Sequence, residues 1–527
     1  MNLNWHFPYP SQRMPLFARN VVATSQPLAA QAGLRMLLRG GNAVDAALAA
    51  AITLTVVEPT GNGIGSDAFA LVWDGKKLSG LNGSGRLPHA WSAERLAGRS
   101  RMAQLGWDAV TVPGAVDLWS ALSRRFGRLP FPELFEPAIG YARHGFMVAP
   151  ITADKWSHAP ELYRDFPDFT ATFLPGGRPP RPGELFVPPG LADTLKSLAE
   201  THGESLYRGE LAKRIVSRSQ ETGGCFSEAD LAGHRTEWVE PLSQEWNGVT
   251  LYELPPNGQG LTVLIALGIL KRLAIEQYPV DSPDSLHLQI EAMKKAFGAA
   301  FRQIADPAWM QVPPAALLTD AFLKECADAI RMDRADSPPA AVPQDGGTVY
   351  LTAADEEGMM VSFIQSNYRG FGSGIVIPGT GISLQNRGAG FTLEEGHPNR
   401  AAGGKRPYHT IIPGFVMKDG APLMSFGVMG AHMQAQGHIQ MMVRVFAGRQ
   451  NPQAAADAPR WYVAEDSRLS LEAGFGIAVR EELERRGHIL AGNTPTSVFG
   501  GAQIIHRLPH GYCAASDPRK DGQAVGY

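Results

Sequence analysis

The character of the sequence changes abruptly at Thr348. Residues 337–347 read as an irregular, exposed segment, because prolines and a closing pair of glycines disfavour regular structure. Directly after it, apolar side chains alternate with period two over residues 349–353 up to a turn at 355–358, and they alternate again at 361–363 on the return. The pattern predicts a β-hairpin whose first strand begins at Thr348, at the end of a loose linker.

Other stretches show helical spacing. Residues 28–57 form an alanine-rich helical pattern that the Gly-Gly-Asn run at 40–42 interrupts, as a helix stop followed by a residue that caps the next helix. Apolar residues spaced by 4, 3, 4, 4 and 3 positions predict one buried face of a long helix over 282–304. A strand at 422–426 precedes a turn and a helix that runs to about Phe446. Strands and helices interleave, so the fold class is α/β or α+β.

Charge and composition exclude several classes of protein. The 48 Lys and Arg against 51 Asp and Glu give a net charge of −3, which without basic blocks argues against a nucleic-acid partner. The cysteines are widely spaced, the 14 histidines are dispersed and no phosphate-binding loop is present, so neither a metal nor a cofactor is expected. The longest apolar run, Ala46 to Val57, has 12 residues, short of the ~20 that span a bilayer. With no secretory signal at its start, the chain is expected to be soluble and cytoplasmic, with no membrane partner.

A threonine at the 347–348 junction has a specific chemistry available to it. The ordinary interpretation is a β-forming residue at a strand start. However, the Thr348 hydroxyl can attack the carbonyl of Gly347 through a five-membered ring, because small, flexible glycines permit the strained geometry. Water then releases a new N-terminal threonine whose α-amine, with a reference pKa of ~7.7–8.0, is suited to act as a general base beside its own hydroxyl. Gly430 and Ala431, at a predicted helix start, offer backbone N–H groups for an oxyanion or simply form an ordinary turn.

Short motifs that are typical of a single protein family lie along nearly the whole chain. In the first half they are Thr24-Ser25-Gln26-Pro27-Leu28-Ala29, Gly40-Gly41-Asn42-Ala43-Val44-Asp45-Ala46-Ala47, Val57-Glu58-Pro59, Gly63-Ile64-Gly65, Val112-Pro113-Gly114 and Phe126-Gly127-Arg128-Leu129-Pro130. In the second half they are Phe371-Gly372-Ser373-Gly374, Pro378-Gly379-Thr380-Gly381 and Ala515-Ser516-Asp517-Pro518-Arg519. With these motifs and the Gly347-Thr348 junction, the sequence resembles the γ-glutamyltransferase (γ-glutamyl transpeptidase) family of N-terminal nucleophile (Ntn) hydrolases.

The resemblance implies a fold, a maturation step and a domain organisation. The family folds as a four-layer αββα sandwich, of class α+β, and is made as a single inactive precursor, a zymogen, that cuts itself before a threonine. Here the cut falls between Gly347 and Thr348, so residues 1–347 become the large chain and residues 348–527 the small chain. The two chains together form one domain, which is a heterodimer, and the resemblance also allows a dimer of such heterodimers.

The resemblance also implies the catalytic groups. Thr348 is the nucleophile, within Thr348-Val349-Tyr350 where the family often has Thr-Thr-His. The second hydroxyl, which hydrogen-bonds the nucleophile, falls on Ser366, a serine where threonine is usual. The two-residue oxyanion hole falls on Gly430 and Ala431, and alanine suffices there because only backbone N–H groups are needed. No metal and no cofactor takes part.

The positions that bind a γ-glutamyl group depart from the family pattern. The arginine that clamps the glutamyl α-carboxylate falls at Ser84, and only Arg86, two residues on, is placed to substitute for it. The aspartate that holds the substrate's α-amine falls at Gly390. A buried charge left without its partner costs ~3–5 kcal/mol, so these changes argue against glutathione as the substrate.

The remaining substrate contacts favour a smaller acid. The family's substrate-contacting asparagine falls at Tyr368, and its paired serines fall at His409 and Thr410. One branch, the cytoplasmic oxamate amidohydrolases of purine breakdown, fits this loss, because oxamate has a carboxylate beside its amide and no α-amine. The first interpretation is therefore a self-processing amidohydrolase that converts a small acidic amide, such as oxamate, to oxalate and ammonia. Arg86, Tyr368, His409 and Thr410 are the candidates to bind the carboxylate.

Two other interpretations stay open. One is a γ-glutamyl hydrolase or transferase with altered contacts, acting on glutathione-like substrates. The other is a catalytically inactive binding protein of the same fold, against which the intact Thr348 and Ser366 count. For His409, a purely structural role is an equal alternative.

Overall fold

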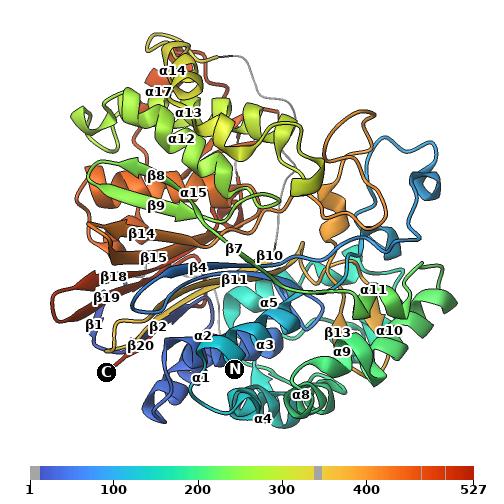
Figure 1. Ribbon diagram of the computed structural model, residues 1–527. Coiled ribbons are helices and arrows are strands. Elements are labelled where there is room, and N and C mark those ends of the chain that lie inside the picture. The colour runs from blue at the N-terminus through green and yellow to red at the C-terminus, as the bar shows by residue number, and fades with distance from the viewer. Residues whose placement is uncertain (1–11, 337–346, 465, 493) are drawn as a thin grey trace.

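The structure, a computed structural model, describes residues 12–336, 347–464, 466–492 and 494–527. Its elements form four layers, in which two β-sheets lie face to face and helices cover both outer faces (Figure 1). The layers confirm the αββα sandwich that the resemblance implied. The first 11 residues, and the segment 337–346 for which the sequence predicts an irregular course, lie outside the described residues.

One sheet carries the hairpin that the sequence predicts at Thr348. All seven strands are paired antiparallel, and the hairpin of β10 and β11 lies near the centre of the sheet. In order across the sheet the strands are β20 (Gln523–Gly526), β2 (Val21–Thr24), β10 (Gly347–Ala354), β11 (Met360–Tyr368), β3 (Asp67–Trp73), β4 (Leu78–Gly83) and β7 (Glu237–Val239).

The second sheet packs against the first and is also antiparallel. Its seven strands, in order, are β1 (Leu16–Ala18), β19 (Gly511–Ser516), β18 (Gly501–Leu508), β15 (Ala421–Met429), β14 (Gly414–Lys418), β9 (Val249–Glu253) and β8 (Leu242–Trp246). Three two-stranded ribbons complete the described strands: β5 (Phe146–Met147) with β6 (Leu185–Phe186), β12 (Val376–Ile377) with β13 (Ile382–Ser383), and β16 (Trp461–Val463) with β17 (Leu469–Leu471).

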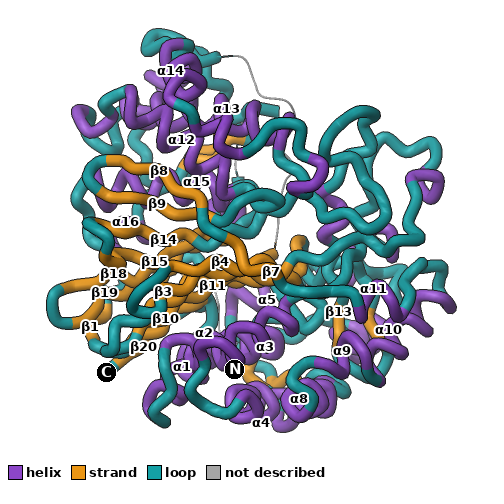
Figure 2. The backbone as a smooth tube through the Cα atoms, viewed as in Figure 1, coloured by secondary structure: helices purple, strands orange, loops and turns teal. Residues whose placement is uncertain are grey.

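Two groups of helices form the outer layers, as Figure 2 shows by colour. The first packs on the sheet of β10: α1 (Pro27–Leu38), α2 (Ala43–Val57), α3 (Ala115–Phe126), α4 (Glu136–His144), α5 (Pro150–Trp156), α6 (Ala159–Leu162), α7 (Pro167–Phe173), α8 (Leu191–Glu200), α9 (Glu204–Arg208), α10 (Glu210–Glu221) and α11 (Glu228–Ala232). The second packs on the sheet of β15: α12 (Gly260–Arg272), α13 (Pro283–Gln303), α14 (Asp320–Asp328), α15 (Met433–Met442), α16 (Pro452–Asp457) and α17 (Ile477–Arg485).

Strand β10 is buried on both faces, because it lies between a helix layer and the second sheet. Val349 and Leu351 join the apolar cluster beneath the first group of helices. Tyr350, between them in sequence, joins the cluster that separates the two sheets. Successive side chains of β10 therefore point in turn to the helix layer and to the space between the two sheets, and both sides are apolar.

The helices around residues 40–42 form as the sequence predicts. The Asn42 side chain accepts hydrogen bonds from the backbone N–H groups of Val44 and Asp45, and the Asp45 carboxylate accepts one from the Asn42 N–H at 2.9 Å. This reciprocal capping box fixes the start of α2. The long helix predicted over 282–304 is also confirmed, as α13.

One boundary differs from the prediction. Strand β15 continues to Met429, beyond the expected end at Phe426, because residues 427–429 pair with 501–503 of β18. The turn that follows is short, and α15 begins at Met433. A π-helical turn at Val443–Ala447 then continues the chain to about the predicted end of the helix.

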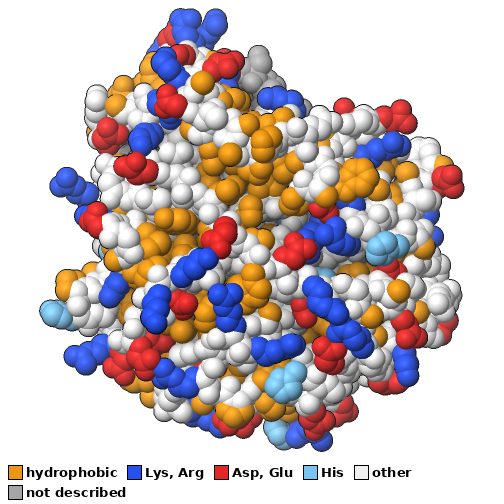
Figure 3. Space-filling view, in the orientation of Figure 1, with side chains coloured by type: hydrophobic (Ala, Val, Ile, Leu, Met, Phe, Trp, Pro, Cys, Tyr) orange, Lys and Arg blue, Asp and Glu red, His pale blue; other side chains and the backbone are white. Residues whose placement is uncertain are grey.

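The surface carries charges of both signs. On the face drawn in Figure 3, Lys and Arg side chains are interspersed with Asp and Glu, in keeping with the net charge of −3. Within the described ranges, no helix has both the length and the apolar character needed to cross a membrane.

Candidate active site

Thr348 lies at the start of a central strand, where the ladder is irregular. The register between β10 and β11 shifts between Gly347 and Val349, so Thr348 occupies a bulge. Its side chain is almost fully buried, and its hydroxyl donates to Ser366 Oγ on β11 at 3.2 Å. The hairpin pattern that predicted the strand therefore also brings the two predicted hydroxyl residues together.

The Ser366 hydroxyl connects the nucleophile to the peptide bond that precedes it. Ser366 Oγ donates to the carbonyl oxygen of Gly347 at 2.7 Å and accepts from the N–H of Tyr368 at 2.7 Å. It also accepts from Arg387 Nη2 at 3.1 Å. A hydroxyl that receives charged and amide donors is polarised toward donation, so Ser366 is placed to stabilise negative charge on the Gly347 oxygen.

Close backbone packing requires glycine at position 347, on the N-terminal side of the Gly347–Thr348 peptide. A Cβ at Gly347 would lie 2.8 Å from the N of Gly370 and 2.9 Å from the O of Thr60. A Cβ at Gly61 would lie 3.3 Å from the N of Thr348. Backbone therefore packs directly on both sides of the Gly347–Thr348 peptide, and side chains are excluded from it.

The predicted oxyanion residues occupy the turn between β15 and α15. Gly430 and Ala431 have φ values of 115° and 49°, so both are in left-handed backbone conformations. For alanine this costs on the order of 1–3 kcal/mol, a strain that is often stored at functional sites. Gln259 Nε2 holds the turn by donating to the Ala431 carbonyl at 3.0 Å. Gly430 lines the same cavity as Thr348.

Arg387 is a buried charged residue at the site that sequence reasoning missed. It lies in a short 3₁₀ turn, Arg387–Gly390, and is fully buried. Its Nη1 donates to Thr410 Oγ1 at 2.7 Å, and its Nη2 donates to Ser366. Its Nε has no hydrogen-bond partner in the described part of the chain. Burial lowers the pKa of Arg387 to about 10, against the attraction of Asp67, so the guanidinium stays charged at neutral pH.

His409 pairs with Asp67 behind the nucleophile. His409 Nε2 lies 3.1 Å from Asp67 Oδ2, and both residues are fully buried. Burial raises the pKa of Asp67 to about 7, with Arg387 opposing the rise, and burial together with Arg387 keeps the pKa of His409 well below its usual value. His409 is therefore neutral. Its ring packs against Phe69 in a tilted arrangement, with 4.7 Å between ring centroids, and His409 is not among the residues that line the cavity.

Tyr368 covers the Arg387 guanidinium. Its ring centroid lies 4.4 Å from the Arg387 Cζ, and its side chain packs with Ala389 and Ala431. Its φ of 76° places it in the left-handed region, which is uncommon for a bulky residue. The aromatic ring therefore lies on the guanidinium, and neither Tyr368 nor Arg387 is among the residues that line the cavity of Thr348.

The structure does not bring Arg86 to this site. Arg86 Nη1 donates to Asp306 at 2.6 Å and to the Gly404 carbonyl at 3.1 Å, and its Nη2 lies 3.7 Å from Glu237. It lines a separate, smaller cavity. The structure therefore places Arg86 outside the cavity of Thr348, where the sequence predicts that it binds the carboxylate.

The two other altered positions have a local explanation. The Ser84 hydroxyl donates to Asn82 Oδ1 at 2.6 Å and is fully buried there. A Cβ at Gly390 would lie 2.6 Å from the carbonyl oxygen of Tyr408, so an aspartate does not fit without moving the backbone. The backbone around Gly390 thus excludes the amine-binding group of a γ-glutamyl site.

A cavity of about 530 Å³ opens onto the nucleophile. Its walls combine apolar side chains with basic ones: Thr60, Gln104, Leu105, Lys155, His158, Ala159, Leu162, Tyr163, Gly347, Thr348, Arg369, Gly370, Phe371, Gly372, Asn386, Met429, Gly430, Ser497 and Lys520. Its volume suits a molecule considerably larger than a two-carbon acid.

Comparison with known proteins gives one consistent result. The sequence model of the family described as γ-glutamyltranspeptidase matches residues 29–527. The glutathione hydrolase-like YwrD proenzyme of Bacillus subtilis is 36% identical over 521 residues, covering 96% of this chain and 98% of that protein. The oxamate amidohydrolase proenzyme of Klebsiella pneumoniae is 36% identical over 518 residues, covering 95% and 97%. The crystal structure of cephalosporin acylase from Bacillus halodurans superposes with a TM-score of 0.96 at 46% identity, covering 100% of this chain and 99% of that one.

Proposed function

Because this chain belongs to the γ-glutamyltranspeptidase family, as its motifs predicted, we propose that it is a precursor that cuts itself before Thr348 and then hydrolyses a small acidic amide. Its enzyme class is that of an Ntn-type amidohydrolase. The inactive binding protein considered above is thereby set aside.

Self-cleavage is supported by the contacts around the Gly347–Thr348 peptide. Thr348 Oγ attacks the carbonyl carbon of Gly347, and the oxygen that gains charge is the one that already accepts a hydrogen bond from Ser366. The chain transfers from nitrogen to oxygen, and water releases chain 1–347 from chain 348–527. In this proposal the two chains form the working heterodimer.

Hydrolysis of the substrate then uses the new N-terminus. The free α-amine of Thr348 takes the proton from its own hydroxyl, and Thr348 Oγ attacks the amide carbon. The N–H groups of Gly430 and Ala431 hold the oxyanion, while the amine returns the proton to the leaving nitrogen. Water resolves the acyl-enzyme. None of these steps draws on a metal or cofactor.

Arg387 carries the substrate assignment. Two consecutive hydrogen bonds, of 3.2 and 3.1 Å, join the Thr348 hydroxyl to this guanidinium through Ser366. We propose that Arg387 binds the carboxylate directly beside the scissile amide, as in oxamate, because its guanidinium is charged and its Nε has no hydrogen-bond partner in the described part of the chain. The α-carboxylate of a γ-glutamyl group lies three carbons further along. Tyr368 and Thr410 contribute here by covering and orienting Arg387.

We propose oxamate as the simplest substrate, with oxalate and ammonia as products. The similarity to a protein named oxamate amidohydrolase supports this assignment. A cytoplasmic role in purine breakdown is part of the proposal. A second candidate is a bulkier acylated amine, favoured by the cavity of about 530 Å³ and by the 46% identity to a structure named cephalosporin acylase. The γ-glutamyl alternative is disfavoured by the packing at Ser84 and Gly390.

The test is a substrate panel on purified, fully cleaved enzyme. Ammonia release from oxamate is measured beside amine release from γ-glutamyl anilide and from a glutaryl β-lactam amide. We expect a higher kcat/KM for oxamate than for γ-glutamyl anilide or the glutaryl amide. Efficient turnover of γ-glutamyl anilide without oxamate hydrolysis would overturn the substrate assignment and leave the amidohydrolase class intact.

A further inference from the structure

The cavity that holds Thr348 has charged groups of one sign only. Lys155, Arg369 and Lys520 line it together with His158, and none of its lining residues in the described part of the chain is acidic. Arg369 is partly engaged, since its Nη1 donates to Gln104 Oε1 at 3.2 Å. Arg387 does not line this cavity, so these cations form a second positive region beside the nucleophile.

Lys520 is buried next to the oxyanion turn. Its side chain is about 5% exposed, and its methylenes lie across Gly501, where a Cβ would stand 2.6 Å from Lys520 Cε. Gly501 pairs with Met429, the residue before Gly430. Over the described ranges, no carboxylate forms an ion pair with the Lys520 ammonium, although Glu58 and Asp517 act on it from further away.

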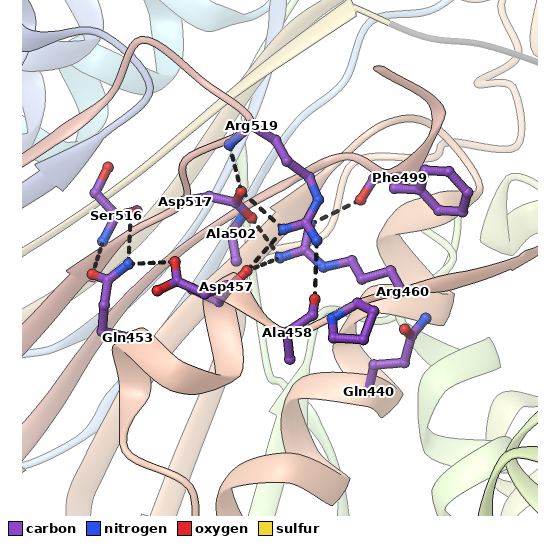
Figure 4. A network of polar contacts seen from close by, with 12 residues as sticks. Gln440, Gln453, Asp457, Ala458, Arg460, Phe499, Ala502, Ser516, Asp517 and Arg519 are labelled. Atoms are coloured by element: carbon purple, nitrogen blue, oxygen red, sulfur yellow. Dashed lines mark hydrogen bonds and ion pairs between the residues drawn. The ribbon is translucent and has the colours of Figure 1, made fainter. Parts of the chain in front are cut away.

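The segment that carries Lys520 is held rigidly. Figure 4 shows Asp517 between Arg460 and Arg519, with further bonds to the backbone N–H groups of Ala502 and Arg519. Burial alone would raise the pKa of Asp517, but Arg460 and Arg519 lower it to about 2, so the carboxylate stays charged. Lys520 therefore presents its ammonium from a fixed position rather than from a mobile loop.

Lys155 reaches the same cavity from α5. Its Nζ lies 3.5 Å from Glu58 Oε1, and the other oxygen of Glu58 accepts from the Ser25 hydroxyl at 2.5 Å. Glu58 precedes the turn at Thr60 and Gly61 that packs on the Gly347–Thr348 peptide. The buried Glu58 carboxylate thus attracts both the Lys155 and the Lys520 ammonium groups.

We propose that Lys155 and Lys520 bind a carboxylate on the amine side of the substrate, so that the preferred substrate is an acidic amide of an amino acid. This inference rests on the proposed function, in which Arg387 takes the carboxylate of the acyl group. Two positive regions beside one nucleophile match two carboxylates, one on each side of the scissile bond. The cavity has the volume for the larger leaving group, which ammonia from oxamate would leave unfilled.

The chemistry is the hydrolysis already derived, with a different leaving group. Thr348 Oγ bonds to the acyl carbon, the C–N bond breaks, and the amino acid leaves with the proton that the α-amine returns. Water then hydrolyses the ester. For an N-oxalyl amino acid the products are oxalate and the amino acid.

The test compares amides that share one acyl group. N-Oxalylglycine, N-oxalyl-β-alanine and N-oxalyl-γ-aminobutyrate are measured against oxamate and against neutral N-oxalylglycinamide on the cleaved enzyme. At least one of the anionic amides is expected to exceed the neutral amide in kcat/KM by about 10- to 100-fold, as a charged hydrogen bond allows. Equal rates for charged and neutral amides would overturn the inference.

Variants of Lys155 and Lys520 test whether these lysines cause the preference for anionic amides. Lys155→Met and Lys520→Met are expected to remove the preference for the anionic amides, so that kcat/KM for N-oxalylglycine falls to that for neutral N-oxalylglycinamide. Lys520→Arg, which keeps the charge, is expected to retain part of the preference if the methionine variant folds poorly. Lys196→Met, at an exposed position beside Glu200, is the control for a change of one unit in net charge. An equal fall in kcat/KM for N-oxalylglycine and for N-oxalylglycinamide, with the preference for the anion retained, would contradict a role in leaving-group binding.

A binding experiment separates this inference from the proposed function. Burial and the neighbouring Lys155 lower the pKa of Lys520 to about 7, with Glu58 opposing them. A bound carboxylate favours the charged ammonium, so succinate binding at pH 8 is expected to take up a proton, measured by calorimetry in two buffers. Binding without amide hydrolysis would overturn the proposed substrate alone. Hydrolysis of oxamate without succinate binding or proton uptake would overturn this inference alone.

Discussion

At the scale of single residues, Ser366 links maturation to catalysis in the proposed mechanism. The same hydroxyl contacts the Thr348 nucleophile and the oxygen of the peptide that Thr348 must break. Before cleavage the Thr348 nitrogen is an amide and cannot act as a base, so precise placement of the hydroxyl and carbonyl matters most at that stage. The Arg387 guanidinium behind Ser366 supplies a fixed positive charge throughout.

Replacing Ser366 should separate its two functions. Ser366→Ala removes the donor to the Gly347 carbonyl, and we expect self-cleavage to slow by about 10²-fold, as for loss of one oxyanion donor. Ser366→Thr keeps the hydroxyl and should mature nearly normally. A time course on denaturing gels, with Thr348→Ala as the uncleaved reference, measures both. Equal cleavage rates for Ser366→Ala and the wild type would exclude the proposed role.

Arg387 and Arg86 give a direct comparison of structure with sequence. We expect Arg387→Met to lower kcat/KM for oxamate by about 10- to 100-fold, because one charged hydrogen bond is lost. Arg86→Met should instead lower stability, since the buried Asp306 loses its partner. Kinetics on the cleaved fraction and thermal unfolding measure the two effects. A larger kinetic loss in Arg86→Met would restore the role that the sequence predicts for Arg86.

The sequence identified candidate site residues within one hairpin more readily than residues that come together only in the folded protein. Thr348 and Ser366 belong to adjacent strands, so a period-two pattern and a family motif sufficed for them. Arg387, Asp67 and His409 come from three separate segments and meet only in the folded protein. No local sequence pattern distinguishes Arg387 from a surface arginine. Arg86 was chosen because it is the basic residue nearest in sequence to Ser84, where the family's arginine falls.

At the scale of elements, the turn from β15 into α15 positions the two residues that we propose as the oxyanion hole. The strand runs to Met429, and the chain then passes through two left-handed residues before the helix begins. The sequence placed this turn earlier, because Gly427 reads as a turn residue when the β18 partner is unknown. In the fold, a Cβ at Gly427 would lie 2.4 Å from the Tyr350 ring, so packing between the sheets explains that glycine.

The two residues of this turn should respond differently to substitution. Gly430 has a φ of 115°, so Gly430→Ala is strained whatever the surrounding space, and we expect it to reduce oxamate hydrolysis by at least about 10-fold. Ala431→Gly relieves a left-handed alanine and should retain activity, with a stability change of only ~1 kcal/mol. Steady-state kinetics and chemical denaturation measure the pair. The opposite ranking would place the oxyanion elsewhere.

At the scale of the whole molecule, the proposed cut before Thr348 divides the sequence but not the fold. In the sheet order, β10 and β11 of the small chain lie between β2 and β3 of the large chain, and β20 of the small chain closes the edge next to β2. The second sheet likewise mixes β8, β9 and β1 of the large chain with strands of the small chain. The family resemblance implied this single domain, whereas length and composition alone allowed several.

This interleaving predicts how the cleaved protein behaves. Because each sheet draws strands from both chains, we expect the two chains to co-elute in size-exclusion chromatography after complete cleavage, and to separate only in denaturant. The isolated large chain should then fail to refold, since the first sheet would lack β10, β11 and β20, and buried strand edges of β2 and β3 would be left unpaired. Circular dichroism of the separated chains, with the remixed pair and Thr348→Ala carried through the same denaturant as controls, measures this. Native-like refolding of the large chain alone would show that the chains are separate domains, contrary to the single αββα unit proposed here.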